Sequence, residues 1–493
     1  MDTPSAPNKL PAARLLRLLA GPMAAAIVLA LELDLPYNGR VCLATFACAV
    51  VWWMTRPMPW GIAALLPMIV FPASGVMTIT ATTALYGQTI FFWIMGTVLV
   101  GYAIDKHGAA QRVALAFLSL PGIGGKMYRL TAAYMGITGV ISMFVSDAAT
   151  IAMMIPIGMS LVRHIRTMTG RQGETNTNLA AFITLGTFYA AVAGGTATVM
   201  GIPHNAMALS LLEKLGGRQL GFFEWMVPGV PVFIALLVMF YVVLWVMAPP
   251  EIRDIPSGEE FLRSEHERLG PMRANEWRVL FVFATMVLLF TLPASAGIVL
   301  GESSPVTVWL DRALSVWVIP PAMMMLLFSI PSAEGDRTAL LTWKDAEQQT
   351  PWSIMLLVVG GVAMTDALSQ FGFIELMGGV VRSLGVGPTT LPYLAAAMVA
   401  LTTDMISGLA ATTLYCSIFI PAAIDVGFNP ASIAILIANV ALALVFPWAG
   451  AASATTFAVG EIPMGRMIGI GIVATAVLAT TAATVHLFLA PFV

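Results

Sequence analysis

Charged residues are scarce in this sequence. Only 10% of the 493 residues are Asp, Glu, Lys or Arg, whereas 58% are hydrophobic. A water-soluble core cannot account for so large an apolar excess, so a soluble globular fold is excluded. The formal net charge of -2 gives no indication of nucleic-acid binding. The composition therefore indicates a polytopic membrane protein.

Cysteine is rarer still, and the motifs of common enzymes are missing. Cys42, Cys48 and Cys416 lie in apolar runs at no metal-ligand spacing, and their odd number argues against a disulfide framework. Neither Gly-x-Ser-x-Gly nor His-Glu-x-x-His occurs. We therefore interpret the cysteines as packing residues and expect neither an enzyme nor a bound organic cofactor.

Long apolar stretches are abundant. A spanning helix needs about 20 apolar residues, and about eleven stretches of the sequence come close to this length, some of them shortened by Gly or Pro. The first apolar run, 18–33, continues into further spans and has no convincing cleavage site, so we interpret it as an uncleaved span. Basic residues in front of it predict that residues 1–15 form a cytoplasmic N-terminus, in a plasma membrane that we expect to be a bacterial inner membrane.

A polar interruption at residues 143–156, Met-Phe-Val-Ser-Asp-Ala-Ala-Thr-Ile-Ala-Met-Met-Ile-Pro, lies inside an apolar segment. In hydrocarbon the freed backbone groups must find partners, so such a break indicates a buried or cavity-lining site. Lys126 and Arg129 precede this segment, and Arg163 and Arg166 follow it. By the positive-inside rule both flanks are cytoplasmic, which predicts a re-entrant hairpin over 127–163.

The second half repeats these features. Gly360 and Gly372 have the same spacing as Gly96 and Gly108, and a second polar break follows at 403–414. The second hairpin, 388–425, has few basic flanks, so we expect it to enter from the opposite side of the membrane. This predicts two inverted repeats, 16–247 and 276–493, joined by a charged connecting loop at 248–275. Each repeat also contains a broken span, at 194–205 and at 447–453.

The residues at these breaks suit ions. Helix N-termini favour anions, whereas C-terminal carbonyl groups and small hydroxyl side chains suit a hard cation. The structural alternative is that Ser146 and Asp147 only cap a buried helix and that the glycines allow close packing. Four breaks paired across two repeats favour a binding site.

The breaks resemble those of the divalent anion/sodium symporter family, which includes the sodium-dicarboxylate and sodium-sulfate cotransporters. That family has Ser-Asn-Thr at each hairpin tip, and here residues 146–150 read Ser-Asp-Ala-Ala-Thr, followed by Met-Met-Ile-Pro-Ile at 153–157. The family loop Gly-Gly-Thr-Ala-Thr-x-x-Gly-Thr-Pro-Pro-Asn is similar to residues 194–205. Here Ile202 stands at the position of its last Thr, and His204 at that of its second Pro. The resemblance extends from about Trp52 to the C-terminus.

The resemblance implies an elevator-type homodimer with one sodium site at each tip and the substrate between the tips. The implied substrate-binding residues are Ser146, Asp147, Ala148, Pro203, Ser407, Gly408, Leu409 and Gly450. A first sodium or proton site would involve Ser146, Asp147, Thr150, Gly194, Gly195, Thr196 and Asn205. A second site would involve Ser407, Ala449 and Ser453.

The second half departs from the family pattern. Residues 403–409 read Thr-Asp-Met-Ile-Ser-Gly-Leu where the family has Thr-Glu-x-x-Ser-Asn-Thr, and 447–453 read Pro-Trp-Ala-Gly-Ala-Ala-Ser where it has Pro-Val-Ala-Thr-Pro-Pro-Asn. Gly408 and Gly450 remove side-chain ligands, so we expect a weakened second site. Asp147 stands at the place of an asparagine, where it could bind a cation or carry a coupling proton. His204 could relay protons or act as a hydrogen-bonding fixture.

The sequence thus predicts a secondary active transporter for a small anion, cation-coupled or exchanging. A dicarboxylate is expected first, followed by a sulfate-like anion, with sodium or a proton as the coupling ion. The alternatives are a proton-coupled permease for a monocarboxylate or other anion, and a non-transporting membrane sensor of the same fold.

Overall fold

The computed structural model describes residues 12–171, 174–175, 177–255, 257–301, 303–333, 338–373, 376, 379, 383 and 385–493. Regular structure in these ranges is helical, apart from two isolated β-bridges. Residues 1–11 of the predicted cytoplasmic N-terminus lie outside the described residues, and the first helix begins at Ala12.

The helices of the first half run to the charged connection. They are α1 (Ala12–Ala30), α2 (Tyr37–Thr55), α3 (Trp60–Ala63), α4 (Pro67–Ser74), α5 (Ile79–Ala84), α6 (Thr89–Lys106), α7 (Ala109–Leu118), α8 (Met127–Ser142), α9 (Asp147–Met168), α10 (Asn178–Gly195), α11 (Pro203–Gly216) and α12 (Phe222–Met247). The connection contains α13 (Gly258–Arg268).

The second half repeats much of this order. Its elements are α14 (Ala274–Leu300), α15 (Pro305–Ala313), α16 (Ile319–Ser329), α17 (Trp343–Gln349), α18 (Trp352–Ser369), α20 (Leu391–Ile406), α21 (Gly408–Val426), α22 (Pro430–Val440), α23 (Ala451–Ala458), α24 (Met464–Leu489) and the 3-10 helix η1 (Ala490–Phe492).

Eight helical segments of the described ranges are long and apolar enough to cross a membrane. They are Ile79–Lys106, Asp147–Met168, Asn178–Gly195, Phe222–Met247, Ala274–Leu300, Trp352–Ser369, Gly408–Val426 and Met464–Phe492. The expected all-α polytopic membrane fold is thereby confirmed. Several shorter apolar helices add to these segments, so the total of about eleven spans stays a prediction.

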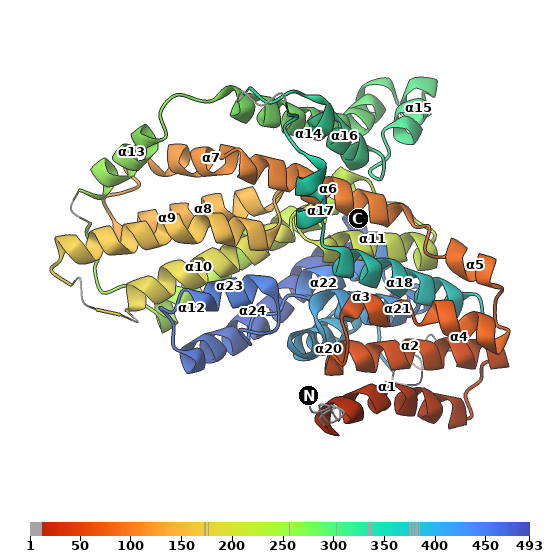
Figure 1. Cartoon of the computed structure of the whole chain (residues 1–493). Helices are drawn as coiled ribbons and strands as arrows, with labels where there is room; N and C mark the ends of the chain where they lie inside the picture. Colours follow the sequence, from red (N-terminus) through yellow and green to blue (C-terminus); the bar gives the residue numbers. More distant parts are fainter. Residues whose placement is uncertain are drawn as a thin grey trace, which may run out of the picture.

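Two sets of four helices pack in the same way (Figure 1). In the first half α10 lies against α8, α9 and α12, and in the second half α22 lies against α20, α21 and α24. The sets interlock, because α11 packs on α21 and α22, while α23 packs on α9 and α10. A buried ion pair between Arg166 and Glu461, 2.9 Å between Nη2 and Oε2, adds a polar link between the two halves.

Two glycines allow close backbone approaches between the halves. A Cβ at Gly96 on α6 would lie 2.5 Å from the carbonyl carbon of Pro320 on α16, and a Cβ at Gly360 on α18 would lie 2.4 Å from the oxygen of Ala64 at the end of α3. Only glycine permits such approaches without a backbone shift. Gly108 and Gly372, which follow at equal spacing, both have positive φ angles of 75° and 85°.

The charged connection is partly ordered as a helix. Leu262 of α13 is buried, and a Cβ at Gly124, just before α8, would lie 2.6 Å from the nitrogen of Glu259. Helix α13 packs on α7. The segment expected as a solvated loop therefore includes a docked helix, because its few apolar residues lie on one helical face.

Arg112 explains how the amphipathic helix α7 is held. The Nε atom of Arg112 lies 2.6 Å from Oε2 of Glu276 at the start of α14, and its Nη1 donates to the carbonyl oxygen of Gly270 at 2.8 Å. A charge that the sequence leaves unpaired on an apolar helix therefore has a carboxylate partner from the second half.

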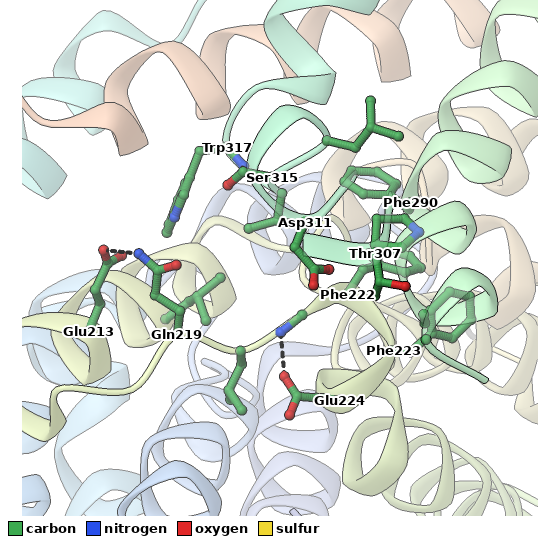
Figure 2. Close-up of a pocket in the computed structure, with 18 of the residues that line it drawn as sticks. Glu213, Gln219, Phe222, Phe223, Glu224, Phe290, Thr307, Asp311, Ser315 and Trp317 are labelled. Carbon is green, nitrogen blue, oxygen red and sulfur yellow. Dashed lines mark hydrogen bonds between the residues drawn. The ribbon is translucent and has the colours of Figure 1, made fainter. Parts of the chain in front are cut away.

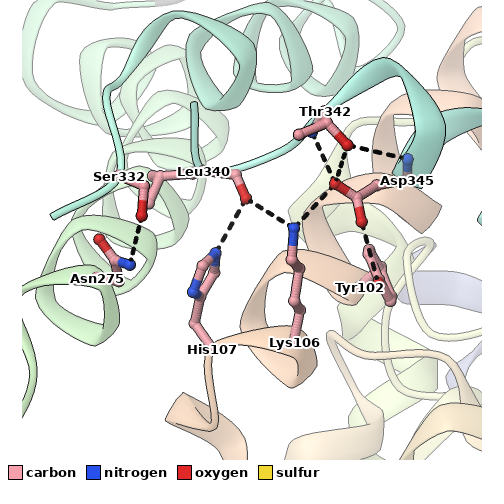
Figure 3. A network of polar contacts seen from close by, with 8 residues as sticks. All are labelled: Tyr102, Lys106, His107, Asn275, Ser332, Leu340, Thr342 and Asp345. Atoms are coloured by element: carbon pink, nitrogen blue, oxygen red, sulfur yellow. Dashed lines mark hydrogen bonds and ion pairs between the residues drawn. The ribbon is translucent and has the colours of Figure 1, made fainter. Parts of the chain in front are cut away.

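A second polar network fixes the end of α6 (Figure 3). The Nζ atom of Lys106 lies 2.9 Å from Oδ2 of Asp345 at the start of α17 and donates to the carbonyl oxygen of Leu340 at 3.3 Å. The imidazole of His107 contacts the same oxygen at 3.0 Å. Thr342 caps α17 and donates its hydroxyl to Asp345 at 2.6 Å. The end of α6 is thus tied to the segment that leads into α18.

Candidate functional site

The first hairpin tip lies between α8 and α9. The hydroxyl of Ser146 accepts a hydrogen bond from the N–H of Ala149 at 3.4 Å, and Oδ1 of Asp147 accepts one from the N–H of Ala148 at 2.7 Å. Both side chains therefore cap the N-terminus of α9, as the structural alternative expects. Thr150 is buried one turn later and donates to the carbonyl oxygen of Val145 at 3.4 Å.

The broken span of the first half faces this tip. Helix α10 ends at Gly195 and α11 begins at Pro203. The Nδ2 group of the fully buried Asn205 donates to the carbonyl oxygens of Gly195 and Thr198, at 2.7 Å each. The hydroxyl of Thr198 donates to the carbonyl oxygen of Met143, just before the tip. Asn205 therefore holds the loop, and Thr198 ties it to the hairpin.

Further contacts hold the end of α10 against α8 and α12. A Cβ at Gly194 would lie 2.1 Å from the carbonyl oxygen of Gly139, so α10 crosses α8 in direct backbone contact. The hydroxyl of the buried Thr196 donates to the carbonyl oxygen of Ala193 at 2.7 Å. The carbonyl oxygen of Thr196 accepts a hydrogen bond from the indole of Trp225 on α12 at 3.2 Å. The contacts of Thr198 with Met143 and of Gly194 with Gly139 thus bring the break against the first hairpin.

One atom of this cluster has no hydrogen-bond partner among the described residues. The Oδ1 atom of Asn205 is buried and unpaired. An unpaired buried carbonyl oxygen costs about 1–3 kcal/mol, so it is a ready ligand for a cation. The hydroxyl of Ser142, at the end of α8, is likewise buried without a partner.

The second tip is a single residue between two helices. Ser407 separates α20 from α21 and has a φ angle of 86°, a conformation rare outside glycine. Its hydroxyl accepts from the N–H of Ala410 at 3.5 Å. A residue held in such a conformation costs about 1–3 kcal/mol, and strain of this kind is concentrated at functional sites.

Backbone and imidazole atoms crowd the next residue, Gly408. A Cβ at this position would lie 2.1 Å from the carbonyl oxygen of Ala441 and 2.4 Å from Nε2 of His204. Glycine is therefore required by the packing here, and the neighbouring Leu409 is buried. The asparagine of the family motif could not fit without moving the loop that follows α22.

The second broken span differs from the expectation. Helix α22 ends at Val440, so the break begins at residue 441, earlier than the expected 447. Asp404 on α20 holds this loop, because its Oδ1 accepts the N–H groups of Val445 and Phe446 at 3.0 and 3.2 Å. The carboxylate takes the place of the carbonyl oxygens that would accept these N–H groups in a continuous helix. Its Oδ2 atom is buried without a partner among the described residues.

The rest of this loop satisfies its own polar groups. The hydroxyl of Ser453 accepts from the N–H of Gly450 at 3.1 Å and donates to the carbonyl oxygen of Gly450 at 3.0 Å. Ala449 is buried next to it. Ser453 is therefore engaged as a helix cap for α23. Asp404 is a further residue of this half that the motif does not assign to the site, and its place at the family's glutamate position is the signal that could have identified it.

A cavity of about 360 Å³ reaches the first tip. It is lined by residues of the hairpin and the loop before α11, and by the opposite face of α6. Among them are Ser146, Gly201, Pro203, Thr97, Tyr102 and Asp105. Pro203, which the resemblance places next to the substrate, is one of these lining residues. Asp147 is not among the lining residues.

A larger cavity of about 660 Å³ lies apart from both tips (Figure 2). It lies between the α11–α12 connection and helices α14 and α15, and Gln219 donates to Glu213 at its edge at 2.5 Å. None of the predicted site residues lines it. We therefore place the candidate site at the smaller cavity and the two tips, where the broken helices converge.

The comparison with known families decides the identity of this arrangement. Residues 12–490 match the family model described as the sodium:sulfate symporter transmembrane region. The chain belongs to this family. The resemblance noted at the hairpin tips is thereby confirmed, and the family is one of transporters rather than enzymes.

A curated relative and two solved structures each match most of the chain. The sodium-dependent dicarboxylate transporter SdcS of Staphylococcus aureus strain NCTC 8325 is 26% identical over 472 residues, covering 93% of this chain and 88% of the relative. The fold is similar to that of the YdaH transporter of Alcanivorax borkumensis, with a TM-score of 0.56, 12% identity and coverage of 93% and 99%. It is also similar to MtrF of Neisseria gonorrhoeae, from a class of antimetabolite efflux pumps, with a TM-score of 0.55, 15% identity and coverage of 94% and 97%.

Proposed function

We propose that this protein is a sodium-coupled secondary active transporter for a small anion, with dicarboxylates as its first substrate class. The proposal is supported by the family match and by the relationship to a sodium-dependent dicarboxylate transporter. The observation that carries it is the pairing of two hairpin tips with two broken helices, which collects helix ends and unpaired oxygens inside the apolar body. Such ends bind ions of both signs.

The coupling sodium binds at the first tip. Asn205 supplies the buried Oδ1 atom, Ser146 and Thr150 supply hydroxyl oxygens nearby, and the end of α10 at Gly194–Thr196 supplies carbonyl groups. Sodium is a hard cation that takes oxygen ligands, and it compensates the unpaired amide oxygen of Asn205. In this proposal the sodium site is complete only while the hydrogen bonds of Thr198 and Asn205 keep the loop in contact with the tip.

The second site is weaker. Ser407 and Ala449 remain as ligands, but Ser453 already caps α23 and Gly408 offers no side chain. The substrate lies between the tips, against Ser146–Ala148 and Pro203 on one side and Ser407–Leu409 and Gly450 on the other. Substrate movement across the membrane follows an elevator mechanism in a homodimer, in a plasma membrane with a cytoplasmic N-terminus.

A monocarboxylate is the second candidate substrate, and one observation favours it. The carboxylate of Asp147 already occupies the positive end of α9, where its Oδ1 accepts the N–H of Ala148 at 2.7 Å. A second carboxylate on the substrate would meet this fixed negative charge unless the bound cation offsets it. Asp147 thus determines how much negative charge the substrate may bring.

Uptake into proteoliposomes tests the proposal. The purified protein is reconstituted, and labelled succinate and a labelled monocarboxylate of similar size are offered under imposed sodium and proton gradients. We expect a sodium gradient to drive succinate uptake, and we expect Asp147→Asn to change the sodium or pH dependence while the protein still folds. Uptake driven only by a proton gradient would overturn sodium coupling. An unchanged ion and pH dependence in Asp147→Asn would remove the role given to that carboxylate.

A further inference from the structure

His204 connects the first half of the chain to the second hairpin tip. It is the second residue of α11, and α11 packs along α21. Its Nε2 and Cε1 atoms lie 2.4 and 2.9 Å from the place where a Cβ of Gly408 would be. The imidazole therefore stands directly against the first residue of α21, where the N-termini of two helices meet.

The surroundings of Nδ1 indicate which ring nitrogen carries the proton. The Nδ1 atom is buried and has no partner among the described residues. We assign the proton of the neutral ring to Nε2, because a proton on Nδ1 would be a buried N–H donor without an acceptor, which is costly. The N–H of the imidazole is then the one that stands at the tip.

The residue after Ser407 offers no side chain to a ligand. Gly408 has none, and the carbonyl oxygen of Ala441, 2.1 Å from the Cβ position, leaves no room for one. The hydroxyl of Ser407 accepts a hydrogen bond from the N–H of Ala410. His204 thus brings a side-chain N–H donor to the position where the tip itself has lost its amide.

The surroundings favour an anion. Helix N-termini carry partial positive charge and free N–H groups, and those of α11 and α21 meet at His204 and Gly408. Pro203, the residue before His204, lines the cavity that reaches the first tip. His204 follows Pro203 and is not itself among the lining residues, so an anion that lies between the tips reaches the imidazole by passing Pro203.

We propose that Nε2–H of His204 donates a hydrogen bond to one carboxylate of the transported anion, so that His204 is a specificity-determining residue of the second tip. The assignment rests on the proposed function, because it takes the substrate to be a carboxylate held between the tips. It gives the first repeat a direct part in the half of the site that the second repeat builds.

Two substitutions of His204 distinguish the effect of the N–H donor from the effect of losing the imidazole ring. The amide nitrogen of glutamine reaches the place of Nε2, whereas that of asparagine reaches only the place of Nδ1. A hydrogen bond to a charged group is worth about a tenfold change in affinity or more. We expect His204→Gln to keep KM for succinate within about threefold, and His204→Asn to raise KM about tenfold or more.

His486 provides a matched control. It is a fully buried histidine of α24, with Nδ1 3.1 Å from the hydroxyl of Ser432 and Nε2 3.2 Å from Nδ2 of Asn439. We expect His486→Asn to lower the yield of folded protein or the maximal rate and to leave KM unchanged.

The measurement is sodium-driven uptake of labelled succinate into proteoliposomes over a range of substrate concentrations. A KM that is unchanged in His204→Asn, or raised equally in the glutamine and asparagine variants, would overturn the assignment while leaving transport intact. Absence of uptake by the wild-type protein would instead refute the proposed function, and the assignment with it.

Discussion

Replacing Asn205 by alanine tests the site at its structural centre. The change removes two hydrogen bonds of 2.7 Å to the carbonyl oxygens of Gly195 and Thr198. The oxygen of Thr198 keeps the N–H of Gly201 at 3.3 Å, so the acceptor that loses its side-chain partner without this compensation is the oxygen of Gly195. Each lost bond is worth about 0.5–1.5 kcal/mol, and a buried group left unpaired costs about 1–3 kcal/mol. We therefore expect a loss of about 2–4 kcal/mol in the free energy of unfolding. We also expect a sharp loss of sodium dependence, because the unpaired Oδ1 atom disappears with the side chain.

Asn429 is the control for this change. Its Nδ2 also donates to two carbonyl oxygens, those of Ala490 and Val493 at 2.9 and 2.8 Å, at a helix start away from the tips. Asn429→Ala should lower stability and leave the sodium concentration for half-maximal uptake unchanged. Thermal unfolding in detergent and sodium titration of uptake measure the two effects. An Asn205→Ala protein with wild-type stability and wild-type sodium response would refute the reasoning.

Two other changes test the packing and the tether at α6. A Cβ at Gly194 would lie 2.1 Å from a backbone oxygen, so Gly194→Ala should lower the unfolding temperature, whereas Gly469→Ala on the exposed face of α24, with open space around it, should leave it unchanged or raise it. Burial opposes ionisation of Asp345, but the hydrogen bonds from Lys106 and Thr342 outweigh it and lower its pKa from the ordinary 3.8 to about 2. The folded state thus binds this proton less readily than the unfolded state, so the ionised group stabilises the fold above about pH 4 and the stabilisation is lost as the pH falls toward 2. Unfolding temperatures measured from pH 5 to 2 should fall more steeply in the wild type than in Asp345→Asn, and parallel curves would contradict this.

The sequence located the tips and the first break well, because their signals are local. Ser146 and Ser407 each begin a helix where the motifs predict a tip. The start of the second break was placed too late, because residues 441–446 are apolar and nothing local ends the helix. The carboxylate that binds this loop, that of Asp404, is distant along the chain.

The contacts of two other residues could not be predicted for the same reason. Arg112 reads as an isolated charge until Glu276 is brought to it from the second half. His204 reads as a lone histidine until α11 packs on α21 and places the ring against Gly408. Such pairs depend on how the two halves interlock, and one sequence carries no pattern from which that packing can be derived.

The measurement that tests the central proposal most directly is the substrate-dependent uptake of radioactive sodium into proteoliposomes that contain the wild-type protein. The account predicts that adding succinate outside accelerates sodium entry, that this extra entry saturates with succinate, and that it is lost in Asn205→Ala but kept in Asn429→Ala. Succinate uptake that proceeds with no accompanying entry of sodium would contradict the account.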